Sequence, residues 1–302
     1  MRKFLRYAVP VPLFLCLAAA SFGAEAIKLR LMTAVYSDQN GGALKRPEGV
    51  ACDEKSLLVV ADTGNGRILL YDVSGEKVMP KGMISVPQLS YPIRVQIDPG
   101  GEILALDGKS RRIARVTPAG EFKGYIEPSG IPTQGTVIPR SFKVDGQGNI
   151  YLLDIFSGRV LVLDSSGKYQ REVPFPQKYG GFSDLAVDGN GIVYLLDSVE
   201  GKVFSAQRNA TAFTPLSGSL KEDLDFPVSI ASDSRGRLFL SDQNGSGIVI
   251  LGPDGSFRGR QSDFGWKDGL LRYPSALAVT EGGNLFIADR QNSRVQVFII
   301  VQ

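Results

Sequence analysis

The chain has 302 residues, with 34 basic and 31 acidic side chains, 35 glycines, two cysteines and no histidine. The lack of histidine excludes a His-based catalytic triad, a His-ligated zinc or haem site and an imidazole proton shuttle, because each needs that ring. Hydrophobic residues make up 43% of the chain and charged residues 22%, as is typical of a folded chain with a substantial core. Any catalysis would depend on carboxylates, Lys, Tyr, Ser or a cation held by oxygen.

The first 26 residues have the pattern of a secretory signal peptide. A basic start precedes an apolar run over 8–20, and Ala24-Glu25-Ala26 is a small-x-small cleavage site. The apolar run is shorter than the roughly 20 residues of a membrane-spanning helix, which disfavours the alternative of an uncleaved anchor. We therefore expect an exported protein, periplasmic or extracellular, with no membrane span after cleavage.

Removal of this segment changes the charge and the thiol content. The formal net charge of +3 falls to +1, because three basic groups and one acidic group are lost. Cys52 becomes the only thiol, so no intramolecular disulfide can form. We interpret Cys52 as a small, buried strand residue rather than a reactive thiol.

Six copies of one sequence phrase follow at intervals of 43 to 47 residues. The copies begin at Pro47, Pro92, Pro139, Phe182, Pro227 and Pro274. Each contains an invariant aspartate at the same place, namely Asp62, Asp107, Asp154, Asp197, Asp242 and Asp289. Five of the six have a basic residue five places later, at Arg67, Arg112, Arg159, Lys202 and Arg294. Six near-equivalent copies cannot converge on one ligand, so we interpret these columns as repeat architecture.

Between the conserved columns the pattern predicts β-strands. Short runs rich in branched and aromatic residues, such as 57–60, 68–71 and 150–153, are closed by turn residues. Turns such as 145–149 combine Asp with Gly, which supplies positive φ. A fourth, weaker run occurs per repeat, for example at 169–173. Four strands per repeat indicate radially packed sheets.

The last repeat resembles the NHL repeat. The resemblance lies in Pro274 followed by Asn284-Leu-Phe-Ile-Ala-Asp289-Arg-Gln-Asn292-Ser-Arg294, and the first repeat carries the same signature as Asp62-Thr-Gly-Asn65-Gly-Arg67. Repeats two to five keep the aspartate but replace the asparagine. The resemblance covers about 27–302 and implies one all-β domain of the exported bacterial type, a six-bladed β-propeller with four antiparallel strands per blade.

The N-terminal segment before the first repeat predicts how the ring closes. The sixth repeat has only three strand-like runs, whereas 27–36 is strand-like and belongs to no repeat. We expect this segment to supply the outer strand of the last blade and cover its edge.

Candidate binding residues lie where the inner strands depart from the family pattern of small residues. Repeats two to four carry Arg94 and Gln96, then Arg140 and Lys143, then Asp184. Unpaired buried charges are costly, so these residues need partners or a ligand-filled channel. We predict that Arg94, Arg140 and Lys143, with Asp184 beside them, bind an anion or carboxylate at the channel mouth. The alternative is a mutually satisfied ion-pair cluster.

Long connections between blades frame the same mouth, at 127–138 and 206–226. Trp266 lies in another such connection. It is a candidate anchor for a partner, and the alternative is packing under its own loop.

These features favour an exported, non-catalytic binding scaffold for a protein, peptide or small anionic ligand, with no cofactor. The alternative is a cation-dependent enzyme, because some related six-bladed propellers are lactonases or lyases that hold a divalent cation in the channel. Here the channel offers chiefly Asp184 among basic residues, which is a poor set of ligands for Ca²⁺. Nucleic-acid binding, known for NHL propellers inside eukaryotic cells, is disfavoured by the net charge of +1 and by export.

Overall fold

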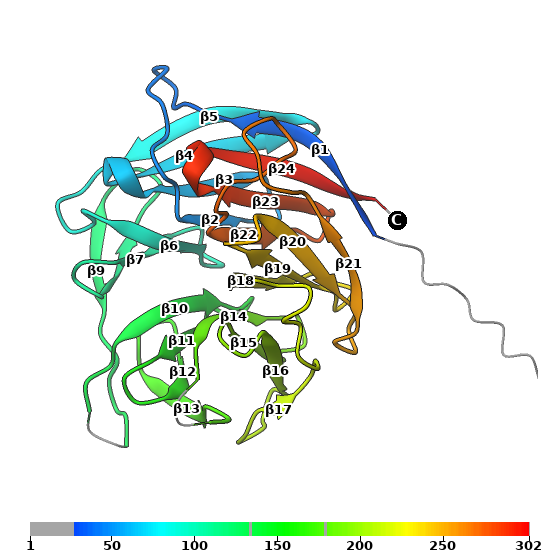
Figure 1. Ribbon diagram of the computed structural model, residues 1–302. Coiled ribbons are helices and arrows are strands. Elements are labelled where there is room, and N and C mark those ends of the chain that lie inside the picture. Colours follow the sequence, from blue (N-terminus) through cyan, green and yellow to red (C-terminus); the bar gives the residue numbers. More distant parts are fainter. Residues whose placement is uncertain (1–26, 133–134, 178–179, 302) are drawn as a thin grey trace, which may run out of the picture.

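The computed structural model describes residues 27–132, 135–177 and 180–301. Within them, six four-stranded antiparallel sheets are arranged as blades around a central channel (Figure 1). The predicted signal peptide, 1–26, lies outside the described residues. In the described part of the chain, no helix is long and apolar enough to cross a membrane.

The blades follow the sequence repeats, and each runs from an inner to an outer strand. Blade one contains β2 (Gly49–Cys52), β3 (Leu57–Asp62), β4 (Arg67–Ser74) and β5 (Lys77–Ile84). Blade two contains β6 (Pro92–Ile97), β7 (Ile103–Asp107), β8 (Ile113–Val116) and β9 (Phe122–Ile126). Blade three contains β10 (Pro139–Val144), β11 (Ile150–Asp154), β12 (Arg159–Leu163) and β13 (Tyr169–Pro174).

The second half of the ring is built the same way. Blade four contains β14 (Phe182–Val187), β15 (Val193–Asp197), β16 (Lys202–Ala206) and the two-residue β17 (Thr214–Pro215). Blade five contains β18 (Pro227–Ser232), β19 (Leu238–Asp242), β20 (Gly247–Leu251) and β21 (Phe257–Gln261). Blade six contains β22 (Ala276–Val279), β23 (Asn284–Asp289), β24 (Arg294–Val301) and β1 (Lys28–Val35). Two short 3₁₀ turns, η1 (Thr63–Asn65) and η2 (Arg290–Asn292), follow the second strands of blades one and six.

The N-terminal strand closes the ring, as predicted. β1 pairs antiparallel with β24, from Lys28 opposite Val301 to Val35 opposite Val295, with a register shift between Leu31 and Thr33. The fold is therefore the expected six-bladed β-propeller, and both ends of the described chain lie in one blade (Figure 1).

The hydrophobic core lies between successive blades, because both faces of the middle strands are buried. One cluster joins Val60 and Leu69 of blade one to Phe286 and Val297 of blade six. Similar clusters join the other neighbouring blades. The apolar runs on both faces of each strand are thus explained by packing between two neighbours.

The invariant aspartates fix the start of each blade. Asp62 is fully buried, accepts the Lys45 N–H at 2.7 Å on one oxygen, and binds Arg67 Nε at 2.7 Å on the other. In blade three, Asp154 likewise accepts the Ile138 N–H at 3.0 Å and pairs with Arg159 at 3.3 Å. These contacts connect the chain entering a blade to its second and third strands, which is an architectural role.

Candidate functional site: the central channel and its mouth

The inner strands line the channel with two layers of side chains, because alternate residues of a strand face the same side. The upper layer, nearer the start of the strands, is formed by Gly49, Arg94, Ser141, Asp184, Ser229 and Ala276. The lower layer is formed by Ala51, Gln96, Lys143, Ala186, Ala231 and Ala278. Large or charged residues therefore occupy the side of the channel made by blades two to four, and small residues occupy most of the other side.

Asp184 connects three blades within the upper layer. Its side chain is fully buried, and its oxygens accept hydrogen bonds from Ser141 Oγ at 2.5 Å and Ser229 Oγ at 2.8 Å, and from the Ile230 N–H at 3.1 Å. Burial alone would raise its pKa, but nearby Lys143 and Arg94, together with the two hydroxyls, lower the pKa of Asp184 below its usual value. The carboxylate is therefore ionised at neutral pH.

Arg94 belongs to the same layer and has no carboxylate in ion-pair contact among the described residues. Its Nη1 donates to the carbonyl oxygens of Glu48 and Ile93, both at 3.0 Å. Its Nε is buried and has no acceptor in the part of the chain that the structure describes. The Glu48 carboxylate is bound instead to Arg290, at 3.0 Å. Arg94 therefore retains donor capacity that no described residue uses.

Arg140 is exposed at the start of β10, at the channel mouth. Desolvation in the mouth, followed by the charges of Arg94 and Arg111, lowers the pKa of Arg140, against the opposing influence of Asp184 and Glu48. Among residues 27–132, 135–177 and 180–301, neither Arg94 nor Arg140 forms an ion pair. We call Arg94, Arg111 and Arg140 the arginine cluster.

The arginines of the repeat columns differ sharply from this cluster. Arg67 pairs with Asp62 at 2.7 Å and with Asp38 at 2.6 Å, and Arg159 pairs with Asp154 and with Glu172. Each architectural arginine is thus neutralised locally, whereas the arginine cluster carries positive charge that the described residues do not pair.

Lys143 lies deeper than the arginine cluster. It lines a cavity of about 180 Å³ formed by the lower halves of the inner strands, together with residues of the lower layer. The structure thus brings Arg94 and Asp184 into one layer and Arg140 to the mouth, and it places Lys143 in a separate compartment beneath them.

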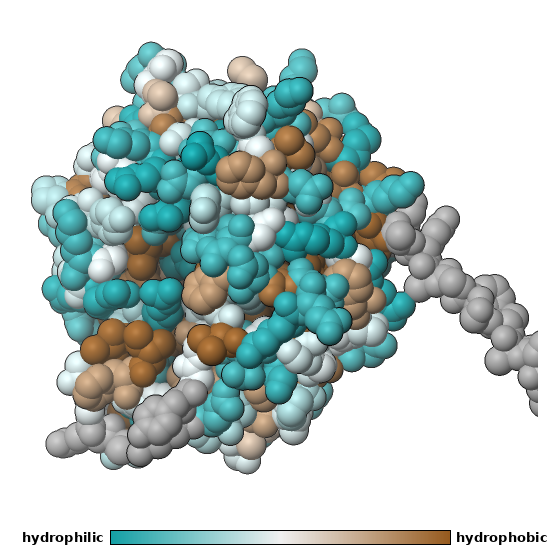
Figure 2. All heavy atoms as spheres, in the orientation of Figure 1, coloured by the Kyte–Doolittle hydropathy of each residue, from teal (hydrophilic) through white to brown (hydrophobic). Residues whose placement is uncertain are grey.

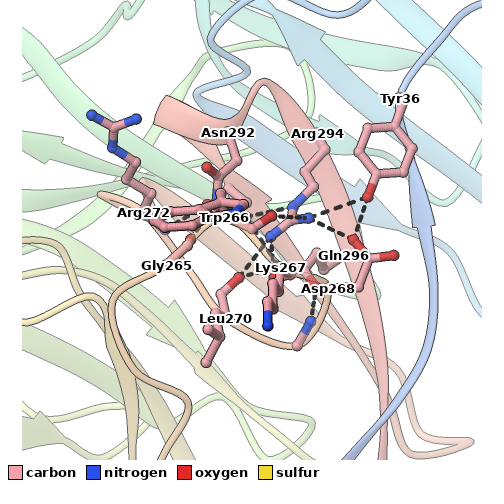
Figure 3. Close-up of polar contacts among 12 residues, drawn as sticks. Tyr36, Gly265, Trp266, Lys267, Asp268, Leu270, Arg272, Asn292, Arg294 and Gln296 are labelled. Carbon is pink, nitrogen blue, oxygen red and sulfur yellow. Dashed lines mark hydrogen bonds and ion pairs between the residues drawn. The ribbon is translucent and has the colours of Figure 1, made fainter.

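Trp266 lies in the connection between β21 and β22, and its side chain is 74% exposed. Arg294 holds this connection through the carbonyl oxygens of Trp266, Lys267 and Leu270, at 2.8–3.0 Å (Figure 3). The alternative of a ring packed under its own loop does not match this exposure. The described contacts do not join Trp266 to the arginine cluster.

Sequence reasoning missed exposed apolar residues at the same face of blades three and four. Ile155 and Phe156 follow the invariant aspartate of blade three, Val199 follows that of blade four, and Phe156 and Val199 are 64% and 59% exposed. Apolar surface is visible over these blades in Figure 2. The available signal was the replacement of polar turn residues, Thr-Gly-Asn in blade one, by Ile-Phe-Ser in blade three.

Hydrogen bonds fix these apolar loops next to the channel mouth. The Ile155 N–H donates to the Ile138 carbonyl at 3.2 Å, two residues before Arg140. The Ser198 N–H donates to the Gly181 carbonyl at 2.9 Å, just before β14. The apolar loops and Arg140 therefore lie at the same end of the inner strands.

The upper layer of the channel offers a divalent cation a single carboxylate, that of Asp184. In the described part of the chain, no group of three or more His, Cys, Asp or Glu side chains is placed to hold a metal ion. Asp184, the acid of the inner strands, uses both oxygens for hydrogen bonds and has Lys143 and Arg94 as its nearest charges. This donor set favours an anion over Ca²⁺.

Comparisons with known proteins agree with the blade architecture. Residues 271–298, in blade six, match the NHL repeat. The chain is therefore a six-bladed β-propeller whose last blade contains an NHL repeat. A stretch of 132 residues is 29% identical to the protein brain tumor of Drosophila melanogaster; this stretch is 42% of the present chain and only 12% of the fly protein.

Several solved structures share the fold at low sequence identity. Virginiamycin B lyase from Staphylococcus aureus is 13% identical with a TM-score of 0.60, over 91% of this chain and 100% of that one. A gluconolactonase from Xanthomonas campestris is 16% identical with a TM-score of 0.65, over 91% and 94% of the chains. An auxiliary nutrient-binding protein from Bacteroides thetaiotaomicron is 14% identical with a TM-score of 0.65, over 91% and 77%. Enzymes and a binding protein thus share this fold, so the fold alone does not select between these functions.

Proposed function

We propose that this propeller is a non-catalytic binding scaffold that recognises an anionic group of a protein, peptide or small molecule at the channel mouth. The observation that carries the proposal is the arginine cluster, whose charges the described residues leave unpaired while Arg67 and Arg159 each pair with two carboxylates. An incoming carboxylate would accept charge-assisted hydrogen bonds from the guanidinium groups of Arg94 and Arg140.

The apolar loops give a protein or peptide partner a second contact. Phe156 and Val199 flank the mouth on neighbouring blades, and exposed apolar side chains beside a charged anchor are typical of recognition surfaces. A partner with a carboxylate next to an apolar side chain would use both features at once. Trp266 offers a separate apolar contact on the blade-six side.

The alternative function is a cation-dependent lactonase- or lyase-like enzyme. The fold shared with virginiamycin B lyase and gluconolactonase supports this alternative. The charge of the channel argues for the scaffold, because Lys143 and Arg94 would repel a divalent cation placed beside Asp184. We propose that binding needs no cofactor.

Substitution of Arg94 and Arg140 by Ala is the direct test of the scaffold. We expect peptides with a free C-terminal carboxylate to bind the wild-type chain and to lose about 30-fold in affinity in the double variant, corresponding to ~2 kcal/mol. The measurement is a titration of fluorescent peptide libraries, with free or amidated C-termini, followed by polarisation. The Arg258→Ala variant on the outer strand β21 is the matched control, since Arg258 pairs loosely with Asp254 at 3.6 Å.

Unchanged affinity in the double variant would rule out the arginine cluster as the site. The effect of added calcium tests the alternative that the chain is an enzyme. The scaffold predicts the same peptide affinity with added Ca²⁺ or with a chelator, whereas stoichiometric bound calcium and lactone hydrolysis lost on chelation would establish the alternative.

We propose that the chain is exported and acts in the periplasm or outside the cell. The support is the basic, apolar and small-residue pattern of 1–26. Expression in a bacterial host should give an envelope or medium protein whose N-terminus, by mass spectrometry, is Ile27. Retention of 1–26 in a cytoplasmic product would contradict export.

A further inference from the structure

A second compartment lies in the lower half of the channel, beneath the upper layer. This inner chamber is a cavity of about 180 Å³, lined by Cys52, Gln96, Lys143, Ala186, Ala231 and Leu277, among others. Asp184, Ser141, Ser229 and Ala276 of the upper layer are 0–3% exposed, so they form most of the floor between the chamber and the mouth. The chamber is therefore a site distinct from the arginine cluster.

Lys143 is the cationic group of the chamber, and the described residues give its ammonium no hydrogen-bond acceptor and no ion pair. The nearest opposite charge is Asp184, but its oxygens already accept three hydrogen bonds from other groups. Burial lowers the pKa of Lys143, Arg94 lowers it further, and Asp184 acts in the opposite direction. A partly desolvated ammonium without a partner among the described residues is available to an anion that enters the chamber.

The other walls of the chamber indicate that the bound anion has a small apolar body. Gln96 lies on the neighbouring blade two beside Lys143, whereas blades four, five and six contribute Ala186, Ala231 and Ala278. The Gln96 Nε2 donates to its own neighbour's carbonyl, Val95 O, at 2.7 Å, which holds the amide against the wall. One polar side and one apolar side suit a short aliphatic chain with a single charged end.

Access is from the opposite face to the arginine cluster. The chamber shares Val144, Val187, Ser232 and Val279 with a wider opening of about 910 Å³. The rim of this opening is acidic overall, because it combines one arginine, Arg235, with five acids, namely Glu54, Asp145, Asp188, Asp233 and Glu281. Burial, together with Glu281 and Asp53, raises the pKa of Glu54, against the Glu281 N–H that it accepts. Such a rim repels phosphates and other multivalent anions more strongly than a monoanion, and it attracts the ammonium group of a zwitterion.

We propose that the inner chamber binds a small aliphatic monocarboxylate, with its carboxylate on the Lys143 ammonium and its apolar body against Ala186, Ala231 and Ala278. A short fatty acid and an aliphatic α-amino acid share this chemistry. The acidic rim adds a place for the ammonium of an amino acid, so the two sources can be separated by experiment.

The Cys52 thiol is not a second reactive group in the chamber. Burial, with the neighbouring Asp53 and Glu54 charges, raises the pKa of the Cys52 thiol to about 12. Its Sγ lies 3.3 Å from the Asp53 carbonyl oxygen. The thiol is therefore protonated at neutral pH and acts as part of the wall.

Calorimetric titration of the full chain with acetate, isovalerate, L-leucine and isopentylamine tests the proposal. Isovalerate or L-leucine should bind, and isopentylamine, which has the same body without a carboxylate, should not. Binding of L-leucine alone would indicate an amino-acid ligand, and binding of isovalerate alone a fatty acid. Binding by neither, up to about 10 mM, would overturn the proposal.

Two variants locate the ligand. Lys143→Met keeps a long side chain, removes the charge and should weaken carboxylate binding at least tenfold, whereas Lys168→Met, at an exposed turn of the same blade, should leave it unchanged. Ala231→Leu fills the chamber and should block binding even if Lys143→Met does not fold by circular dichroism. Equal affinity in wild type and either folded chamber variant would refute the site. Arg140→Ala should keep chamber binding, so failure at the mouth and failure in the chamber are separable.

Discussion

An internal deletion of residues 27–37 is expected to open the ring and lower the melting temperature by roughly 10 °C or more. The deletion removes β1, which pairs along its whole length with β24 and covers Leu285 and Phe298 with Leu29 and Leu31. Loss of three or four partly buried aliphatic side chains costs on the order of 5 kcal/mol, which shifts the melting temperature by this amount in a chain of this size.

Exposure of β24 gives the deletion a second signature. The strand Arg294–Val301 would present an unpaired edge rich in apolar residues, which favours pairing between chains. We therefore expect self-association in size-exclusion chromatography together with the lower melting temperature. The double variant Arg30→Ala and Glu76→Ala, which removes an exposed ion pair on β1 while keeping the strand, should melt like the wild type. A deletion variant that stays monomeric and melts normally would contradict closure by β1.

The ring could be predicted because its determinants repeat. The invariant aspartates and the strand-like runs recur in register, so each repeat supports the strand assignment of the others. Closure by β1 followed from counting strands in the sixth repeat. The fourth strand of blade four was harder to foresee, because only Thr214 and Pro215 pair there, and the rest of that long connection follows no repeat.

The site was predictable in composition but not in arrangement. Large or charged residues in place of the small residues of the family pattern pointed to Arg94, Arg140, Lys143 and Asp184. The positions of these residues on their strands did not show that buried groups of the upper layer separate Lys143 from the channel mouth. That division depends on Ser141 and Ser229, whose hydroxyls reach Asp184 from the two neighbouring blades. Contacts between blades depend on the packing of distant segments, and the sequence pattern within one repeat does not report them.

Replacement of Arg294 by Ala is expected to destabilise the protein by about 3–5 kcal/mol, because it leaves the Asp289 carboxylate buried without its main partner. Arg294 is only 1% exposed and pairs with Asp289 at 2.7 Å and with Asp268 at 2.5 Å. It also donates to Tyr36 Oη at 3.2 Å and to three carbonyls of the loop that carries Trp266 (Figure 3). One side chain thus joins blade six, this loop and the segment that follows β1.

Chemical denaturation, with the anisotropy of the single tryptophan as a second readout, checks this role. The Arg294→Ala variant should lose stability and show faster local motion of Trp266, because the loop loses three hydrogen bonds. Arg294→Lys should recover little of the lost stability, because an ammonium cannot reproduce the planar guanidinium group that donates to several acceptors at once. Combining Arg294→Met with Asp289→Asn should cost less than the sum of the single changes, because no unpaired charge remains. Arg112→Ala removes the equivalent but exposed arginine of blade two and should change the free energy of unfolding by no more than about 0.5 kcal/mol. If Arg112→Ala costs as much stability as Arg294→Ala, burial is not the cause of the loss at Arg294.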